Sequence, residues 1–138
     1  MRVRRARPDE LAACAALYDR VVRETFTWLP TDGAAEKFLA EAAQEEVYVA
    51  EAGGGIAGLA SFYRPENFLH SLYIDEAARG QGVGSALLAH VRSIADGRVF
   101  LKVQKLNSAA IAFYRRRGME ICEHGDPTAP GGGWFKMR

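Results

Sequence analysis

Apolar residues recur along the chain with two different periods, and these periods predict its helices and strands. Spacings of three and four residues, as in Leu11, Cys14 and Tyr18, predict amphipathic helices with one buried side. Short runs rich in Val, Ile, Phe and Tyr between Gly, Pro or Asn predict strands. The helical spacing covers residues 10–26, 34–44, 82–96 and 107–118. The strand pattern covers residues 2–6, 47–52, 56–63, 68–75, 98–104, 119–125 and 134–138.

Turn and capping residues separate these segments into a consistent order. Pro8 followed by two acidic residues marks the start of the first helix, and Gly53–Gly55 joins two strands as a hairpin. Asn107 is expected to be the N-cap of the last helix and Gly118 its C-cap. The order is strand, two helices, three strands, helix, strand, helix and two strands, without a repeat or a linker. The chain is therefore predicted to form one mixed α/β domain, of the α+β type, over residues 1–138.

Charge and cysteine content narrow the class of function. The 18 Lys and Arg residues nearly cancel the 17 Asp and Glu residues, so no overall basic field indicates nucleic-acid binding. Cys14 and Cys122 lie far apart without CxxC spacing, which argues against a disulfide framework or a zinc site and fits a reducing compartment. No run approaches the roughly 20 apolar residues of a membrane span. We therefore expect a cytoplasmic protein without a metal or a membrane, and any anion site has to be local.

Three glycines in five residues, Gly80, Gly82 and Gly84, stand between an expected strand and an expected helix. Glycine lets the main chain approach a ligand closely, and a helix that begins directly afterwards offers unpaired N–H groups. The pattern indicates an anion-binding turn, although by itself it is equally typical of a plain tight turn. It is not a nucleotide P-loop, because no Lys-Ser or Lys-Thr pair follows the last glycine.

Two motifs together resemble the GNAT superfamily of acyl-CoA-dependent N-acetyltransferases. The family hallmark is Arg or Gln, two residues, Gly, one residue, then Gly or Ala, and here it reads Arg79-Gly80-Gln81-Gly82-Val83-Gly84. A second family pattern reads Asn107, Ala110, Phe113-Tyr114 and Gly118. Both occur in the right order, and the resemblance spans residues 2–138. It implies the GNAT fold, a mixed central sheet of about six to seven strands flanked by about four helices.

The resemblance implies that acetyl-CoA is the acetyl donor and that two segments contact it. Main-chain groups at the start of the central helix would bind the diphosphate, and Arg79 would add a charged contact. The strand end Leu72–Ile74 would pair with the pantetheine, with one N–H near the thioester oxygen. Asn107 is either a further contact or only a helix cap, and Phe113 forms a wall. The implied cofactor-binding residues are Leu72, Tyr73, Ile74, Arg79, Gly80, Gln81, Gly82, Val83, Gly84, Ser85, Asn107 and Phe113.

Direct transfer requires a neutral amine, and a free alkylamine with a pKa of about 10.4 is roughly 0.1% neutral at pH 7. His70 is the first candidate for the base that removes the proton, and Glu66 is the second. Regular pairing along residues 68–75 would place His70 on one face with Phe68 and Leu72, among apolar neighbours. A histidine in an apolar strand is also typical of a simple core residue.

The resemblance implies that Tyr114 protonates the departing thiolate, a role compatible with packing of its ring against the sheet. The adjacent arginines 115–117 are read as a solvated helix end rather than as contacts to the ribose phosphate.

The acceptor is expected to bind between two segments that carry aromatic residues. Phe26 and Trp28 follow the first helix, and Trp134 follows a loop that holds His124 and Asp126. They indicate either an aromatic cleft with one acid or rings that cap the core. Because no dense acidic cluster is evident, a small amine or an amino-acid-like acceptor is favoured. A protein N-terminus or lysine, a non-catalytic acyl-CoA sensor and a homodimer stay open as alternatives.

Overall fold

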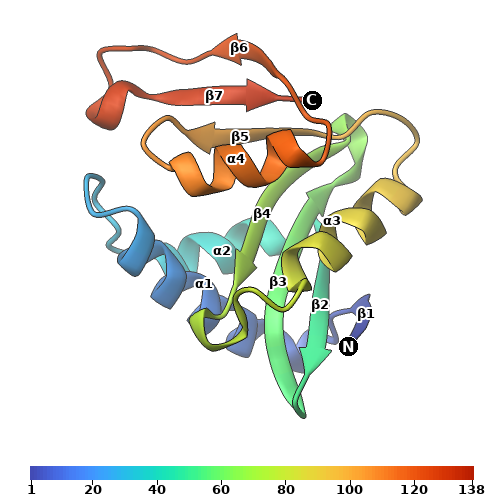
Figure 1. Ribbon diagram of the computed structural model, residues 1–138. Coiled ribbons are helices and arrows are strands. Elements are labelled where there is room, and N and C mark those ends of the chain that lie inside the picture. The colour runs from blue at the N-terminus through green and yellow to red at the C-terminus, as the bar shows by residue number, and fades with distance from the viewer.

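Seven strands form one sheet in the computed structural model, which describes residues 1–138, and four α-helices pack on it (Figure 1). The strands are β1 (Arg2–Arg5), β2 (Glu46–Ala52), β3 (Gly55–Tyr63), β4 (Phe68–Ile74), β5 (Phe100–Gln104), β6 (Ile121–His124) and β7 (Trp134–Met137). The helices are α1 (Leu11–Thr25), α2 (Ala34–Ala42), α3 (Val83–Ile94) and α4 (Ser108–Arg116). Every element predicted from the sequence is present in the predicted order, so the mixed α/β prediction is confirmed.

The helices pack on the sheet through two layers of buried apolar residues, one on each face. α1 and α2 cover one face, where Val49 and Leu59 are fully buried. α3 and α4 cover the other face, where Leu87 and Tyr114 pack with Tyr48. Neighbouring residues of β2 thus enter opposite layers, as the period of two in a strand requires. None of these helices has both the length and the apolar character that crossing a bilayer demands.

The sheet opens between β4 and β5. Its strands follow the order β1-β2-β3-β4-β5-β7-β6, and only the β4–β5 pair is parallel. That pair is limited to Phe68 opposite Phe100 and Leu69 opposite Leu101. Beyond it β4 stays paired with β3, and β5 stays paired with β7, so the two strands diverge toward their carboxyl ends. The edge of β4 at residues 72–74 is therefore left without a strand partner.

β4 contains a bulge at His70, which the expectation of regular pairing misses. Ser71 lies opposite Ser61 and Leu69 opposite Phe62, so His70 is the extra residue in the ladder. A bulge breaks the alternation of faces and re-aims a side chain. His70 is accordingly only partly buried: 37% of its side chain is accessible, and its ring lies beside those of Phe68 and Tyr63. The expectation of regular pairing through His70, on which the shared face with Leu72 depended, was wrong.

Candidate active site

The glycine turn leads into α3 with its main chain open toward a cavity. Gly80 and Gly82 have φ angles of 77° and 80°, and no atom lies within 4 Å of where a Cβ would stand at either residue. Gly82 is the N-cap of α3, and the first helical bond runs from the Ala86 N–H to the Gly82 carbonyl oxygen at 3.0 Å. The N–H groups of residues 83–85 therefore have no helical partner. This is the geometry that binds an anion at a helix start.

A cavity of about 580 Å³, which we call the α3 cavity, opens in front of this turn. Most residues of the expected cofactor-binding set line it; these are Leu72, Tyr73, Ile74, Arg79, Gly80, Gly82, Val83, Gly84, Ser85, Asn107 and Phe113. Gln81 is the exception, since its exposed side-chain amide donates to the Ala77 carbonyl oxygen at 3.4 Å instead. Gly84 differs from its neighbours, because a Cβ there would stand 3.2 Å from the Phe113 ring. Its role is close packing of α3 against α4.

Arg117 is a charged group of the α3 cavity that the sequence reading assigned to a solvated surface. Its Nε donates to Ser85 Oγ at 3.0 Å, and its Nη1 donates to the Phe113 carbonyl oxygen at 3.0 Å. The guanidinium carbon lies 3.7 Å from the centre of the Phe113 ring. Arg117 is thus a fixed cation beside the start of α3, whereas Arg115 is exposed as expected. The signal in the sequence for this position of Arg117 was its spacing of four residues from Phe113, which puts the two side chains on the same face of a helix.

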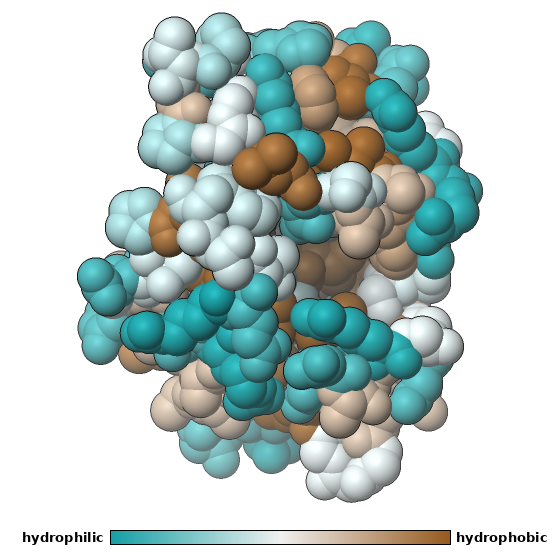
Figure 2. All heavy atoms as spheres, turned by 60° about the vertical axis from the view of Figure 1, so that its left-hand side comes forward, coloured by the Kyte–Doolittle hydropathy of each residue, from teal (hydrophilic) through white to brown (hydrophobic).

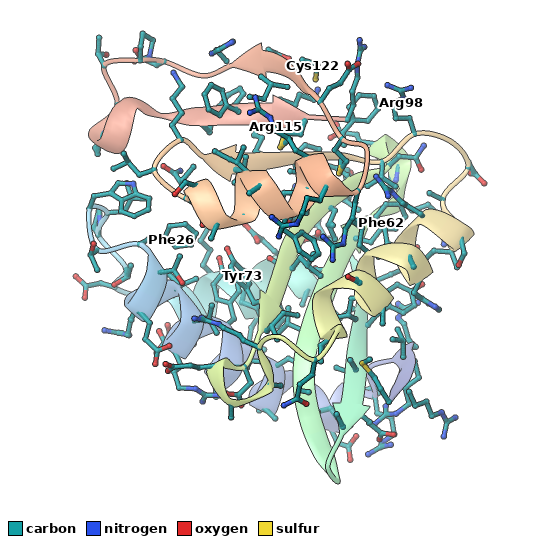
Figure 3. The ribbon with its side chains drawn as sticks, viewed as in Figure 1. Phe26, Phe62, Tyr73, Arg98, Arg115 and Cys122 are labelled. Atoms are coloured by element: carbon teal, nitrogen blue, oxygen red, sulfur yellow. The ribbon has the colours of Figure 1, made fainter.

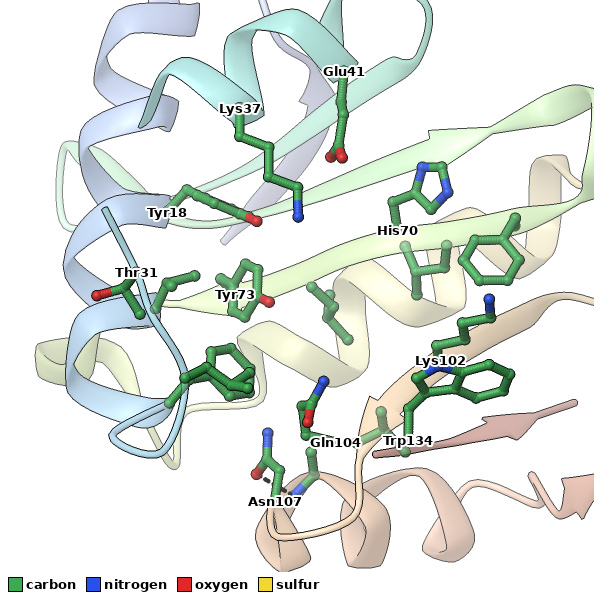
Figure 4. A pocket seen from close by; sticks show the side chains of 18 of the residues that line it. Tyr18, Thr31, Lys37, Glu41, His70, Tyr73, Lys102, Gln104, Asn107 and Trp134 are labelled. Atoms are coloured by element: carbon green, nitrogen blue, oxygen red, sulfur yellow. Dashed lines mark hydrogen bonds between the residues drawn. The ribbon is translucent and has the colours of Figure 1, made fainter. Parts of the chain in front are cut away.

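A second cavity of about 610 Å³, which we call the α2 cavity, lies on the other side of the opening between β4 and β5 (Figure 4). The space-filling view turned toward this side shows a hollow with apolar atoms at its floor and polar groups around its rim (Figure 2). Five residues line both cavities: Leu72, Tyr73, Asn107, Ala110 and Tyr114. The two cavities therefore meet at the free edge of β4 and the start of α4.

Tyr114 lies at this junction. Its side chain is buried, with the residue 8% exposed, and burial raises the pKa of its hydroxyl above the ordinary value of 10. None of the side-chain hydrogen bonds of the chain involves this hydroxyl, so it remains available to a ligand. A phenol with a pKa of 10 or above keeps its proton at neutral pH, so this hydroxyl has a hydrogen to donate to a ligand.

Asn107 also lines both cavities, and its position is compatible with both expected roles, that of a helix cap and that of a ligand contact. Its Oδ1 accepts a hydrogen bond from the Ala110 N–H at 3.3 Å, so it is the N-cap of α4. Its amide nitrogen takes no part in the cap and points toward the α2 cavity (Figure 4). One end of the side chain thus holds the helix, and the other end can donate to a ligand.

His70 lines the α2 cavity and is hydrogen-bonded to a carboxylate that the sequence reading missed. Its Nδ1 lies 2.5 Å from Oε1 of Glu45, whose side chain is only 3% exposed. The imidazole also stacks on Tyr63, with ring centres 6.0 Å apart. The hydrogen bond to Glu45 raises the pKa of His70 above 6.5, and partial burial opposes this shift. Glu66, the alternative base, lines the same cavity and forms no ion pair.

The expected aromatic cleft is present in part. Phe26 and Trp134 line the α2 cavity, whereas Trp28 does not. Trp28 instead braces the wall: its ring packs edge-on against Phe26 at 5.6 Å, and its Nε1 donates to Gln104 Oε1 at 3.4 Å. A Cβ at Gly131 would stand 2.4 Å from Trp28, so this ring fixes the loop before β7. Figure 3 shows Phe26 and Tyr73 facing the space between α1 and β4.

The acid of the cleft is not Asp126. That carboxylate accepts hydrogen bonds from the N–H and the hydroxyl of Thr128, at 2.9 and 2.7 Å. Neither Asp126 nor His124 lines the α2 cavity. Glu41 of α2 and Glu66 are the acids that line it. The sequence reading also missed the other polar lining residues, which are Tyr18, Thr31, Lys37, Lys102 and Gln104.

A comparison with known proteins identifies the family to which this chain belongs. The chain belongs to the acetyltransferase (GNAT) family, whose model matches residues 11–119. It is similar to the 5-NmdU N-acetyltransferase of Pseudomonas phage PaMx11, with 34% identity over 94 residues, which are 61% of this chain and 65% of that protein. It is also similar to the N-alpha-acetyltransferase RimI of Mycobacterium tuberculosis, with 36% identity over 78 residues.

The second match covers 51% of this chain and 49% of that protein, so the chain spans less than two thirds of the length of either relative. Among solved structures, PaiA N-acetyltransferase from Thermoplasma acidophilum in complex with coenzyme A superposes with a TM-score of 0.81 at 19% identity. That likeness covers 99% of this chain and 96% of that chain, and it shows that the fold is shared.

Proposed function

We propose that this protein is an N-acetyltransferase that moves the acetyl group of acetyl-CoA to the primary amine of a small or amino-acid-like acceptor, by direct attack and without a metal. The observation that carries the proposal is the meeting of two cavities at Tyr114 and the free edge of β4. One cavity has an anion-binding helix start, and the other has a histidine and carboxylates. A donor and an acceptor can therefore approach one another from opposite sides of the sheet.

The residues of the α3 cavity fit acetyl-CoA. A diphosphate needs main-chain donors without side chains in front of them, and the left-handed glycines Gly80 and Gly82 leave that space open. Arg79 and Arg117 line the same cavity and supply positive charge. The free edge of β4 at residues 72–74 offers main-chain groups to the pantetheine amides. When bound, acetyl-CoA supplies the activated acetyl thioester.

The residues at the junction supply the proton transfers. In our proposal His70 accepts the proton that the amine loses, directly or through water, as a C–N bond forms at the acetyl carbon and the C–S bond breaks. Tyr114 donates the proton that the departing sulfur takes up. In our proposal a main-chain N–H at the β4 edge and the Asn107 amide hold the carbonyl oxygen, and both segments line the two cavities.

The proposal is tested by incubating the protein with acetyl-CoA and a panel of amines, while free thiol and acetylated product are measured. We expect thiol release that depends on the amine and equals the acetylated product in amount. Tight binding of CoA without thiol release on any amine would instead identify a non-catalytic sensor.

The pH dependence of the rate tests the role of His70. Because the Glu45 carboxylate raises the pKa of His70, the imidazole becomes a free base only as the pH rises through that raised value, above 6.5. We expect kcat/KM to rise through this inflection and Glu45→Gln to move the inflection to lower pH. The control is Glu66→Gln, which removes the alternative base. If Glu66→Gln removes the inflection and Glu45→Gln leaves it at the same pH, Glu66 is the base.

A further inference from the structure

The α2 cavity contains charged side chains that lack ion-pair partners. Several opposite charges elsewhere on the surface pair closely, as in Arg64–Glu46 at 2.6 Å and Arg4–Glu10 at 2.8 Å. The lining residues Lys37, Glu41, Glu66 and Lys102 take part in none of the ion pairs of the chain. Both signs of charge are thus left free beside an apolar floor, where an ionic ligand gains most from them.

Lys37 and Glu41 form the most specific part of this arrangement. They lie four residues apart on α2, so their side chains leave the same face of the helix one turn apart. Both point into the cavity, away from the helix (Figure 4). They do not pair with each other within 4.0 Å, although this spacing allows it. A cation and an anion held side by side complement a ligand that carries an anion and a cation on neighbouring atoms.

Of this pair, Glu41 is the residue whose charge acts on the proposed base, His70. Its negative charge adds to the raised pKa of His70, after the main effect of Glu45. It also adds to the raised pKa of Tyr73, for which burial is the main cause. Tyr73 lines both cavities. Glu41 and His70 line the same cavity, so an ammonium group drawn to Glu41 would share that cavity with the proposed base.

The remaining lining residues indicate the body of the ligand. Six aromatic rings line the cavity with Leu29, namely those of Tyr18, Phe26, Phe68, Tyr73, Tyr114 and Trp134. Lys102 stands on the opposite wall from α2, with its ammonium 4.1 Å from the centre of the Trp134 ring, so an aromatic face already accompanies its charge. Burial of an apolar side group against these rings adds to the charge recognition.

We infer that the acceptor is a free amino acid with a bulky apolar or aromatic side chain, whose ammonium group is bound by Glu41 and whose carboxylate is bound by Lys37. The inference rests on the proposed acetyl transfer and specifies its acceptor. A peptide N-terminus lacks this carboxylate at the α-carbon, so it does not satisfy the Lys37–Glu41 pair. Once bound, the ammonium loses its proton to His70 and attacks as the amine.

The test compares phenylalanine with phenethylamine, which lacks the carboxylate, and with phenylalaninamide, in which the carboxylate is replaced by a neutral amide. The value of kcat/KM for each is measured with saturating acetyl-CoA in the wild type, Lys37→Gln, Lys102→Gln and Lys105→Gln. Because the three amines differ in basicity, the readout is the phenylalanine to phenethylamine ratio in each variant relative to the wild type. Lys105 lies outside the cavity, over Phe135, and is the matched surface control.

We expect Lys37→Gln to lower this ratio about tenfold, the order of a partly exposed charge-assisted hydrogen bond. Lys105→Gln should leave the ratio as it is in the wild type. The ratio of kcat/KM for phenylalaninamide to that for phenethylamine should be the same in Lys37→Gln as in the wild type, because neither compound carries the carboxylate. An equal ratio in Lys37→Gln and the wild type would overturn the inference and leave acetyl transfer intact. A ratio that falls in Lys102→Gln and not in Lys37→Gln would overturn it as well. Absence of thiol release with every amine would instead contradict the proposed acetyl transfer itself.

Discussion

Replacing Gly82 by Glu should weaken CoA binding more than about a hundredfold, because a carboxylate would stand at the start of α3 where the diphosphate is expected. Juxtaposed like charges cost several kcal/mol, and each 1.4 kcal/mol is about tenfold in affinity. Gly82 has a φ of 80° and open space where a side chain would begin, so the new group has room to point into the α3 cavity. Titration calorimetry with CoA measures the effect.

This substitution also places a side chain on a left-handed backbone, which costs roughly 1–2 kcal/mol of stability. Gly54 in the β2–β3 hairpin has a φ of 81°, equally open surroundings and no part in either cavity. Gly54→Glu therefore controls for the strain. Both variants should lose similar thermal stability, and only Gly82→Glu should lose CoA affinity. Unchanged affinity in Gly82→Glu would remove the diphosphate from the start of α3.

Tyr114→Phe should lower kcat about 10²- to 10⁴-fold while leaving CoA affinity nearly unchanged. The hydroxyl makes no hydrogen bond within the chain, so its removal deletes no internal contact. The hydroxyl is protonated throughout the neutral range, since the ordinary tyrosine pKa of 10 lies well above it and burial moves the pKa of Tyr114 further up. Steady-state kinetics and CoA calorimetry on the same preparation separate the two effects.

Tyr48→Phe is the matched control for this variant. Tyr48 is also buried, at 7% exposure, but its hydroxyl donates to Glu46 at 2.6 Å and it lies outside both cavities. Its replacement should reduce thermal stability, since a hydrogen bond to a charged group is lost, and should spare turnover. A Tyr114→Phe enzyme as fast as the wild type would transfer the acid role to water.

The order of elements and the glycine turn were predictable because their causes are local. Periodicity selects helix or strand, and the Asn107 cap and the left-handed glycines follow from single residues. The family motif likewise led to Tyr114, which the fold then places between the two cavities. These features depend on neighbours in the chain, so the sequence alone contains their signal.

The features that the sequence reading missed depend on contacts across the fold. The bulge at His70 is a property of the pairing between β3 and β4, and Glu45, directly before β2, meets His70 from 25 positions away. Arg117 becomes a cavity residue because it meets Ser85, 32 positions away, across two helices. Trp28 resembles a cleft residue in the sequence but braces a loop more than 100 positions further along the chain.

The central claim is that main-chain amides at the start of α3 hold the diphosphate of CoA, and amide NMR spectra of the 15.1 kDa chain test it most directly. We predict that CoA shifts the N–H resonances of residues 82–85 more than any others. Pantetheine, which has no diphosphate, should leave these four unshifted while affecting residues 72–74. Equal shifts at residues 82–85 with both compounds, or shifts confined to another part of the chain, would contradict the account.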